Sequence, residues 1–426
     1  MDYISRDIYL EKLKNRIGNG FVKVITGPRR SGKSWLLSRI FTDYLLSAGV
    51  GEDEIIHISF DLDDERNQPE LLSGEALKQY LYSRITDSGK KYYVMLDEVQ
   101  EVSDFERIVN GLAAKENVDV YVTGSNSRFL SSDINTLFRG RGDEVRVWPF
   151  CFREFVQERD EPVARLWKEY YTYGGMPALK GLRTSEQKIT YLQRLWDKVY
   201  LSDVVERHHI RDRVALEALA DSLCSSIGSL NNPTRLSNTL KSVQQVNISS
   251  ETVNSYLDYL GDAYLFEGAR RYNIKGHRYL ESIKKYYSID VGLRNARINF
   301  RQQEVTHLME NVIYNELRVR GYAVDVGLVE SREMVAGKQT QKQYEVDFIV
   351  SDGMDKCYIQ SAYRIDSEEK KSQEISSLRK IDDSFRKIVI VGDDIATYKD
   401  EHGITYMGLF DFLLNPSSIS FEHAGV

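Results

Sequence analysis

Residues 27–34 read Gly-Pro-Arg-Arg-Ser-Gly-Lys-Ser, a pattern whose chemistry suits a polyphosphate. Glycines let backbone N–H groups curl around phosphate oxygens, the lysine reaches the outer phosphates, and the final serine hydroxyl can bind Mg²⁺. An apolar run at 21–26 precedes the motif, and a helical pattern at 33–44 follows it with its positive dipole end. The sequence therefore predicts a P-loop that binds ATP through Gly27, Pro28, Arg29, Arg30, Ser31, Gly32, Lys33 and Ser34.

A second apolar strand, predicted at 92–96, runs directly into two carboxylates, Asp97 and Glu98. Phosphoryl transfer depends on positioning and on charge stabilisation, so an aspartate at a strand end can hold Mg²⁺ and a neighbouring glutamate can activate water. We expect Asp97 to join Ser34 as a metal ligand and Glu98 to act as the catalytic base. This pair favours hydrolysis of the nucleotide over binding alone.

A third strand, predicted at 118–122, ends in Thr-Gly-Ser-Asn at 123–126. A polar residue in this position can sense the terminal phosphate, and Ser125 or Asn126 is suited to that role. We take Asn126 as the catalytic candidate. An ordinary polar turn after a buried strand is the alternative interpretation.

Two arginines, Arg139 and Arg141, flank Gly140 just before a strand predicted at 145–148. An arginine inserted by a neighbouring subunit can neutralise charge that develops during phosphoryl transfer. Arg141 is our candidate for that role in a homo-oligomer, although either arginine could instead form a surface salt bridge.

The composition is that of a multidomain cytoplasmic protein. The chain has 426 residues, of which 42% are hydrophobic, and this length predicts two to four domains. No apolar run approaches the roughly 18–20 residues that cross a bilayer, and the N-terminus lacks a basic region followed by an apolar core. The three cysteines are far apart in sequence and have no metal-ligand spacing, which indicates buried thiols.

The charge of the chain is unevenly distributed. Its formal net charge is −7, which argues against a surface devoted to nucleic acid. Residues 268–301, however, hold nine Lys or Arg against two acids, a net charge of +7. This basic segment is the candidate for contact with DNA, and a protein–protein module with a solvated basic edge is the alternative.

The order of predicted elements divides the chain into four blocks. Residues 1–150 alternate β and α patterns, which predicts an α/β ATPase core with a parallel sheet covered on both faces. Residues 151–206 are helical and suit a lid over the nucleotide. Residues 207–301 show three helices and then two short strands around a basic turn, the order of a winged helix. The candidate recognition helix, which begins near 250, lacks Lys and Arg.

The last block, 302–426, shows the order α-β-β-β-α-β, as in PD-(D/E)xK nucleases. In those enzymes a helix glutamate, a strand aspartate and a following Glu-x-Lys gather around Mg²⁺. Glu310 or Glu316 and Asp347 stand where the first two belong, but the third element is Gln-Ser-Ala at 360–362. Without a lysine to polarise water, we expect this nuclease-like domain to be inactive.

In their order along the chain, these motifs resemble the bacterial and archaeal AAA+-type ATPases that carry a C-terminal domain of unknown function. The resemblance rests on the motifs at 27–34, 96–100, 123–125, 173–177, 285–293, 345–348 and 358–360. It implies an ATPase fold related to archaeal origin-recognition and STAND proteins, with ring or dimer assembly. It also implies that Gly175 and Pro177 of the lid approach the adenine.

The leading hypothesis is an Mg²⁺-dependent ATPase whose nucleotide state switches the C-terminal half, which then engages DNA or a protein partner. Three alternatives come from other functional classes. A P-loop kinase would transfer phosphate to an acceptor. A metal-dependent nuclease would cut DNA through Asp347. A nucleotide-gated interaction module would retain ATP with little turnover.

Overall fold

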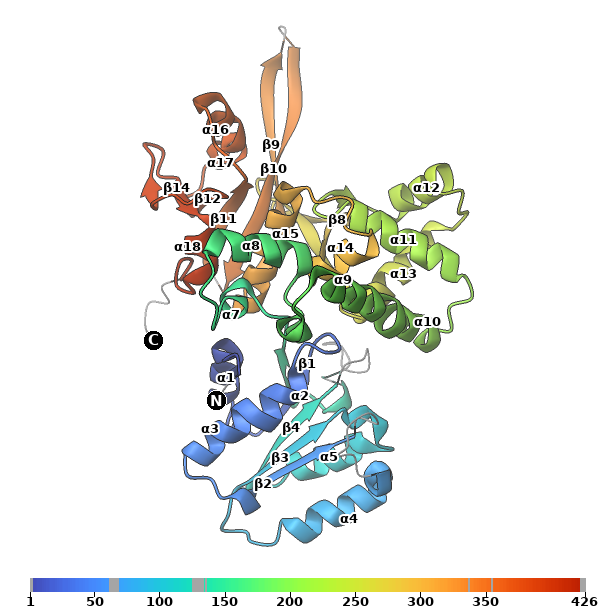
Figure 1. Ribbon diagram of the computed structural model, residues 1–426. Helices are drawn as coiled ribbons and strands as arrows, with labels where there is room; N and C mark the ends of the chain where they lie inside the picture. Colours follow the sequence, from blue (N-terminus) through green and yellow to red (C-terminus); the bar gives the residue numbers. More distant parts are fainter. Residues whose placement is uncertain are drawn as a thin grey trace. The chain divides into compact units, whose positions relative to one another are not determined.

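The computed structural model describes residues 3–60, 69–124, 134, 136–335, 338–353 and 355–421. The chain folds as two compact units, Met1–Pro149 (unit 1) and Phe150–Val426 (unit 2) (Figure 1). Among the described residues, no helix is both long and apolar enough to cross a membrane.

Unit 1 is built on a five-stranded sheet in the order β2-β3-β4-β1-β5, with every pair parallel. The strand that leads into the P-loop therefore lies between two others. This is the sheet that the alternating β and α pattern predicts. The elements are α1 Asp7–Lys14, β1 Val22–Thr26, α2 Lys33–Trp35, η1 Leu36–Phe41, α3 Thr42–Ser47, η2 Glu52–Glu54, β2 Ile55–Ser59, η3 Pro69–Leu72, α4 Gly74–Arg84, β3 Tyr92–Asp97, η4 Val99–Glu101, α5 Phe105–Ala113, β4 Val118–Thr123 and β5 Gly142–Arg146.

Each face of this sheet buries its own hydrophobic core, because successive side chains of a strand point to opposite faces. On one face, Val94 and Leu96 of β3 pack with apolar residues of α4 and α5. On the other, Tyr93 and Met95 pack with α1, η1 and α3. Figure 1 shows these helices on the two sides of the sheet. Burial on both faces explains why the strands read as continuous apolar runs.

Unit 2 combines helices with a mixed sheet (Figure 1). Its helices are α7 Phe152–Phe155, α8 Val163–Tyr173, η6 Pro177–Gly181, α9 Ser185–Arg194, η7 Leu195–Leu201, α10 Ser202–Arg207, α11 Arg213–Ser225, α12 Pro233–Val243, α13 Ser250–Asp262, α14 Val291–Arg297, α15 Val305–Arg320, α16 Glu368–Glu374, α17 Ser376–Arg379 and α18 Leu409–Leu414. Its strands are β6 Leu230–Asn231, β7 Phe266–Asn273, β8 Arg278–Ser288, β9 Ala323–Val335, β10 Lys338–Asp352, β11 Asp355–Ala362, β12 Arg386–Val391, β13 Tyr398–Lys399 and β14 Thr405–Gly408.

One sheet crosses the boundary that we predicted between the third and fourth blocks. Its order is β13-β14-β12-β11-β10-β9-β7-β8-β6. The ribbon β7–β8 follows three helices, as predicted for a winged helix, but β7 also pairs in parallel with β9. The ribbon is therefore part of the same sheet as the nuclease-like elements. The finer division of unit 2 into lid, winged helix and nuclease-like domain stays a prediction.

Two pairs of strands in this sheet are longer than the sequence predicts. The two short strands expected around the basic turn are β7 and β8, of eight and eleven residues. Likewise, β9 and β10 pair with each other from Val335, which lies opposite Lys338, back to the rest of unit 2. This second ribbon, β9–β10, projects beyond the rest of unit 2 (Figure 1). Polar and charged residues interrupt the apolar pattern in these segments. Hydrophobic periodicity therefore does not indicate the full length of the strands.

Close backbone contacts join two of the motifs from the sequence, at 173–177 and 285–293, within unit 2. Asp290 caps α14, accepting a hydrogen bond from Leu293 N at 2.9 Å, and also accepts one from Gly175 N at 2.7 Å. Burial raises the pKa of Asp290 to about 6. A Cβ atom on Gly292 would lie 1.8 Å from the carbonyl oxygen of Tyr173. Only glycine allows this approach.

We expect Gly292→Ala to destabilise unit 2 strongly, because the backbone of Tyr173 cannot yield as a flexible side chain would. Overpacking of a well-packed site typically costs about 1–3 kcal/mol, and this contact belongs at the upper end. Thermal unfolding measures the loss. Gly181→Ala is the matched control, since a Cβ there meets nothing within 4 Å; equal melting temperatures for the two variants would contradict the close-packing explanation.

Candidate functional site

The P-loop connects β1 to α2 at the carboxyl end of the parallel sheet, the edge where such sheets bind ligands. Gly27 has φ of 133° and Gly32 has φ of 94°, both in the region that glycine favours. A Cβ on Gly27 would lie 2.1 Å from the carbonyl oxygen of Val147. The glycines of the motif are therefore required by backbone geometry. Arg30, exposed at the tip, also has a positive φ, of 62°.

Lys33 is buried and its ammonium points back into the loop. Its Nζ donates to the carbonyl oxygens of Gly27 at 3.0 Å and Pro28 at 2.9 Å. Burial lowers the pKa of Lys33, and the carboxylates of Glu98 and Asp97 oppose that shift. The loop also contains a buried serine, Ser31, whose Oγ has no hydrogen-bond partner among the described residues. A cationic donor and an unpartnered hydroxyl inside a glycine-lined loop fit a bound phosphate chain.

Asp97 ends β3 and lies against Ser34, so the two predicted metal ligands are brought together. The Ser34 and Thr123 hydroxyls both hydrogen-bond to the Asp97 carboxylate. Asp97 is buried, and burial raises its pKa, while those hydrogen bonds oppose the rise. A carboxylate beside a serine hydroxyl is a fitting donor pair for Mg²⁺, whose charge would stabilise the ionised form of Asp97.

Glu98 follows Asp97 in a left-handed conformation, with φ of 52° and ψ of 45°. This conformation costs free energy in a residue other than glycine, and such residues are enriched at functional sites. The backbone N–H of Glu98 donates to Thr123 Oγ1 at 2.9 Å, and its carboxylate accepts a hydrogen bond from Gln100. Thr123 therefore links the two acidic residues.

Sequence reasoning assigned no role to Thr123 or Gln100, although both lie in motifs that it singled out. The register of the sheet gives the signal for Thr123. Leu96 pairs with Val122 in parallel strands, so the next residues, Asp97 and Thr123, are neighbours.

Arg6, near the start of α1, is a second residue that the sequence did not reveal. It is buried, and its guanidinium donates to the carbonyl oxygens of Ser31 at 2.7 Å and Trp148 at 2.7 Å. It also lies 4.5 Å from the centre of the Tyr9 ring. Tyr9 accepts a hydrogen bond from Trp148 N at 3.1 Å. Arg6 thus fixes a carbonyl of the P-loop to the chain that follows β5.

The remaining candidates of unit 1 have different outcomes. Ser125 and Asn126 lie outside the described residues, so the phosphate sensor stays a prediction. Arg139 and Arg141 are exposed on the turn before β5, where the Arg141 carbonyl accepts from Val22 N at 2.8 Å. Their exposure is compatible with a role toward another subunit, and the choice of Arg141 also stays a prediction.

The structure gives Gly175 a packing role within unit 2. Its N–H donates to Asp290, its carbonyl accepts from Phe150 N at 2.8 Å, and a Cβ on it would lie 2.0 Å from the Phe150 carbonyl oxygen. Pro177 is half-buried at the first position of η6. Contact of Gly175 and Pro177 with adenine stays a prediction.

Most of the basic segment is neutralised or buried, which its composition did not reveal. Arg297 pairs with Asp221, Asp197 and Glu217. Arg294 is buried and donates to backbone carbonyls. Arg278 and Arg301 are exposed and Lys284 is half-buried. The other members are Arg271, which is buried, Arg270 paired with Asp325, Lys275 paired with Asp382, and Lys285 surrounded by carboxylates.

The nuclease-like elements bring one helix glutamate to the strand aspartate. Glu310 of α15 and Asp347 of β10 both contact Lys285. Glu316 is buried instead against Arg320, at 2.8 Å. Of the two glutamates that the sequence left open, Glu310 therefore occupies the site.

Comparisons with known proteins agree with this architecture. Residues 19–156 match the AAA domain family, and residues 164–304 match a domain of unknown function, DUF8612. An uncharacterized protein of Haemophilus influenzae is 34% identical over 394 residues, which cover 91% of this chain and 93% of that protein. The chain belongs to this family of AAA-domain proteins. A second relative, the uncharacterized protein MJ1544 of Methanocaldococcus jannaschii, is 30% identical over 93% of this chain and 86% of its own length.

Unit 1 is thus an AAA-type P-loop domain, followed by a domain of unknown function. Among solved structures, the chain is similar to the Aeropyrum pernix ORC1 protein in complex with DNA, at 12% identity and a TM-score of 0.27. That match covers 70% of this chain and 94% of the other. At so low a TM-score the assignment rests on the family match and on the P-loop.

We expect Arg6→Ala to destabilise unit 1 and to weaken ATP binding, because the Ser31 carbonyl loses its donor. Each hydrogen bond from a charged group contributes about 1.5–3 kcal/mol, so the two together amount to roughly 3 kcal/mol or more. Urea unfolding checks the stability, and calorimetry checks the affinity. Lys14→Ala, which removes an exposed pair with Glu11, should change neither. Arg6→Lys should recover part of the affinity; a variant Arg6→Ala with wild-type affinity would exclude the positioning role.

Proposed function

We propose that the chain is an Mg²⁺-dependent ATPase. The observation that carries this proposal is the convergence of Lys33, Ser34, Asp97 and Glu98 at one edge of the unit 1 sheet. Lys33 binds the outer phosphates, and Ser34 and Asp97 hold the metal. Bound Mg²⁺ supplies positive charge that neutralises the phosphates during transfer.

Glu98 is the residue that separates hydrolysis from mere binding. As the base, it orients the attacking water and accepts its proton. Its left-handed backbone and its hydrogen bond with Gln100 support this role, because both hold the carboxylate at the end of β3. Gln100 is then a positioning residue. A chain that retains ATP with negligible turnover is the competing function.

Unit 2 is the part that engages a partner in this proposal, and nucleotide state in unit 1 sets its engagement. Neutralisation of the basic segment favours a protein partner over DNA, because six of its nine cations are buried or paired: Arg270, Arg271, Lys275, Lys285, Arg294 and Arg297. Assembly into a homo-oligomer, with Arg141 reaching a neighbouring nucleotide, belongs to the same proposal.

Two substitutions separate binding from turnover. We expect Lys33→Ala to abolish ATP binding, since it removes the buried ammonium of the loop. We expect Glu98→Gln to bind ATP normally and to hydrolyse it at least about 100-fold more slowly, the usual contribution of a general base. Calorimetry and phosphate release measure the two quantities. Glu101→Gln, an exposed carboxylate three residues further on, is the control. Equal hydrolysis by wild type and Glu98→Gln would remove Glu98 from the mechanism.

A salt series tests the partner. Each phosphate contact contributes about −0.9 to the slope of log K against log [salt], so the three cations left in the basic segment allow a slope no steeper than about −3. We expect weak DNA binding within that limit, measured by fluorescence anisotropy with and without ATP. Arg278→Ala with Arg301→Ala should flatten whatever slope remains. A steeper slope that these substitutions reduce would favour DNA as the partner.

A further inference from the structure

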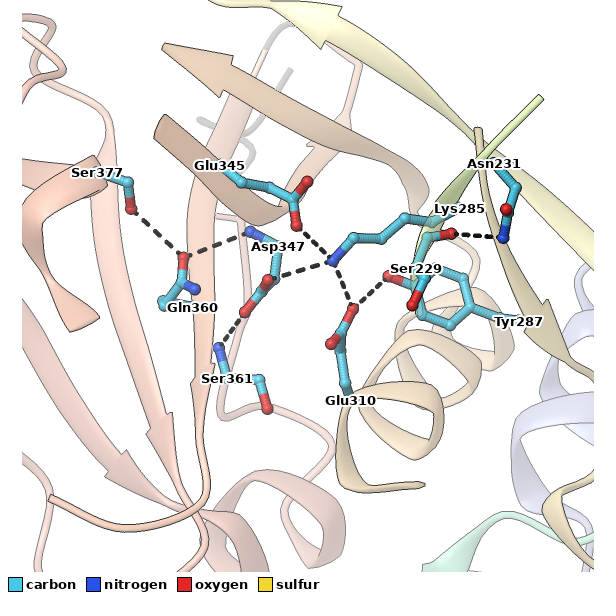
Figure 2. Close-up of polar contacts among 10 residues, drawn as sticks. All are labelled: Ser229, Asn231, Lys285, Tyr287, Glu310, Glu345, Asp347, Gln360, Ser361 and Ser377. Atoms are coloured by element: carbon cyan, nitrogen blue, oxygen red, sulfur yellow. Dashed lines mark hydrogen bonds and ion pairs between the residues drawn. The ribbon is translucent and has the colours of Figure 1, made fainter. Parts of the chain in front are cut away.

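The most highly charged buried site in unit 2 is centred on Lys285 of β8. Its Nζ lies 2.7 Å from Glu345 Oε1, 2.9 Å from Glu310 Oε1 and 3.5 Å from Asp347 Oδ1 (Figure 2). Glu310 comes from α15, and the other two carboxylates come from β10. The side chains of Lys285, Glu310 and Asp347 are all at least 90% buried. Three elements thus direct their charges at one point.

Two of these carboxylates, Glu310 and Asp347, are the ones that a nuclease-like site would use to hold a divalent metal. The ammonium of Lys285 stands between them, where the metal would lie. A lysine has three N–H donors and no acceptor, and three carboxylate oxygens surround it here. The donors are therefore used up, and a divalent ion in the same place would meet a positive charge at contact distance.

Several other polar atoms around Glu310 and Asp347 are also engaged. Tyr287 donates its hydroxyl to Glu310 Oε1 at 2.7 Å, and Ser361 N donates to Asp347 Oδ2 at 2.9 Å. Gln360 accepts from Asp347 N at 3.4 Å, and its amide oxygen also faces the Ser377 hydroxyl (Figure 2). With Lys285 in place, no group of three or more His, Cys, Asp or Glu among the described residues is arranged to hold a metal. The residues present do not fit a divalent ion.

We propose that Lys285 is a built-in cation that replaces the divalent metal of the nuclease-like site and closes the site to metal. Its ammonium joins β8 to α15 and β10. The ion pairs at the position that a metal would occupy therefore connect the β7–β8 ribbon to the nuclease-like elements. Unit 2 accordingly serves as a scaffold and not as a nuclease.

The balance of charge explains why the lysine stays in place. Burial lowers the pKa of Lys285, but the three carboxylates outweigh burial and the net shift is upward. Burial, with Glu310 close by, raises the pKa of Asp347 to about 7. One ammonium among three carboxylates still leaves excess negative charge, so removal of Lys285 leaves a site that attracts another cation. This consequence can be measured.

The test compares Mn²⁺ binding by the full chain with and without Lys285. All proteins carry Asp97→Asn, which removes the carboxylate at the end of β3 as a competing metal ligand, and nucleotide is left out. Free Mn²⁺ is followed by electron paramagnetic resonance, and melting temperature is followed in parallel. The variants are Lys285→Ala and, to keep the aliphatic stem for folding, Lys285→Met. Lys284→Ala is the matched control, because it removes the neighbouring, half-buried lysine of the same strand.

We expect the background protein and Lys284→Ala to take up no Mn²⁺ in unit 2 and to melt at a temperature that Mn²⁺ does not change. Lys285→Ala and Lys285→Met should melt lower without metal. They should bind one Mn²⁺ per chain at least tenfold more tightly than the background protein and recover stability with it. Adding Asp347→Asn should abolish this response, which assigns the ion to this site.

Three results would overturn the proposal. The first is that the background protein takes up Mn²⁺ and that this uptake is lost when Asp347→Asn is added. The second is relaxation of supercoiled plasmid by the background protein that is lost in Lys285→Ala, since Lys285 would then be a nuclease lysine. The third is that Lys285→Ala and Lys285→Met both fold, but neither binds Mn²⁺ nor is stabilised by it.

Discussion

Parallel pairing of β3 with β4, and of β4 with β1, fixes the position of each described polar group in the nucleotide site. Because parallel strands end at the same edge, Asp97 and Thr123 become neighbours and the P-loop begins beside them. The hydroxyl of Thr123 then connects the Asp97 carboxylate to the Glu98 backbone. These bonds hold the chain on the N-terminal side of the left-handed conformation at Glu98. The chemistry of the site thus depends on strand order before it depends on any single side chain.

Unit 2 shows how far charge along a chain can differ from charge in space. The basic segment is strongly positive by count, yet several of its cations pair with acidic residues from many separate parts of the sequence. Arg297 meets acids of α11, and Lys285 meets acids of α15 and β10. A linear count treats these lysines and arginines as one surface. In the folded protein, these side chains instead form ion pairs that connect different helices and strands.

The sequence predicts what local patterns encode. Buried parallel strands appear as apolar runs, so the parallel sheet of unit 1, its P-loop and the acidic pair at the end of β3 were all predictable. Interactions between distant residues were not, because no local pattern marks them. Arg6 reaches a carbonyl 142 residues away, and Asp290 reaches an N–H 115 residues away. Lys285 of β8 lies among the carboxylates of the nuclease-like elements, a placement that only the paired sheet reveals.

Two of the buried lysines, Lys33 and Lys285, have partners of opposite kinds, and this difference decides what each site can do. Lys33 donates to neutral carbonyl oxygens of its own loop. An anionic phosphate attracts an ammonium more strongly than a carbonyl does, so a ligand can replace those partners without leaving a charge unpaired. Lys285 is bound to carboxylates, and breaking a buried ion pair costs about 3–5 kcal/mol because the partner charge is left behind. The first lysine is therefore free to exchange partners with a nucleotide, whereas the second is a permanent part of the fold.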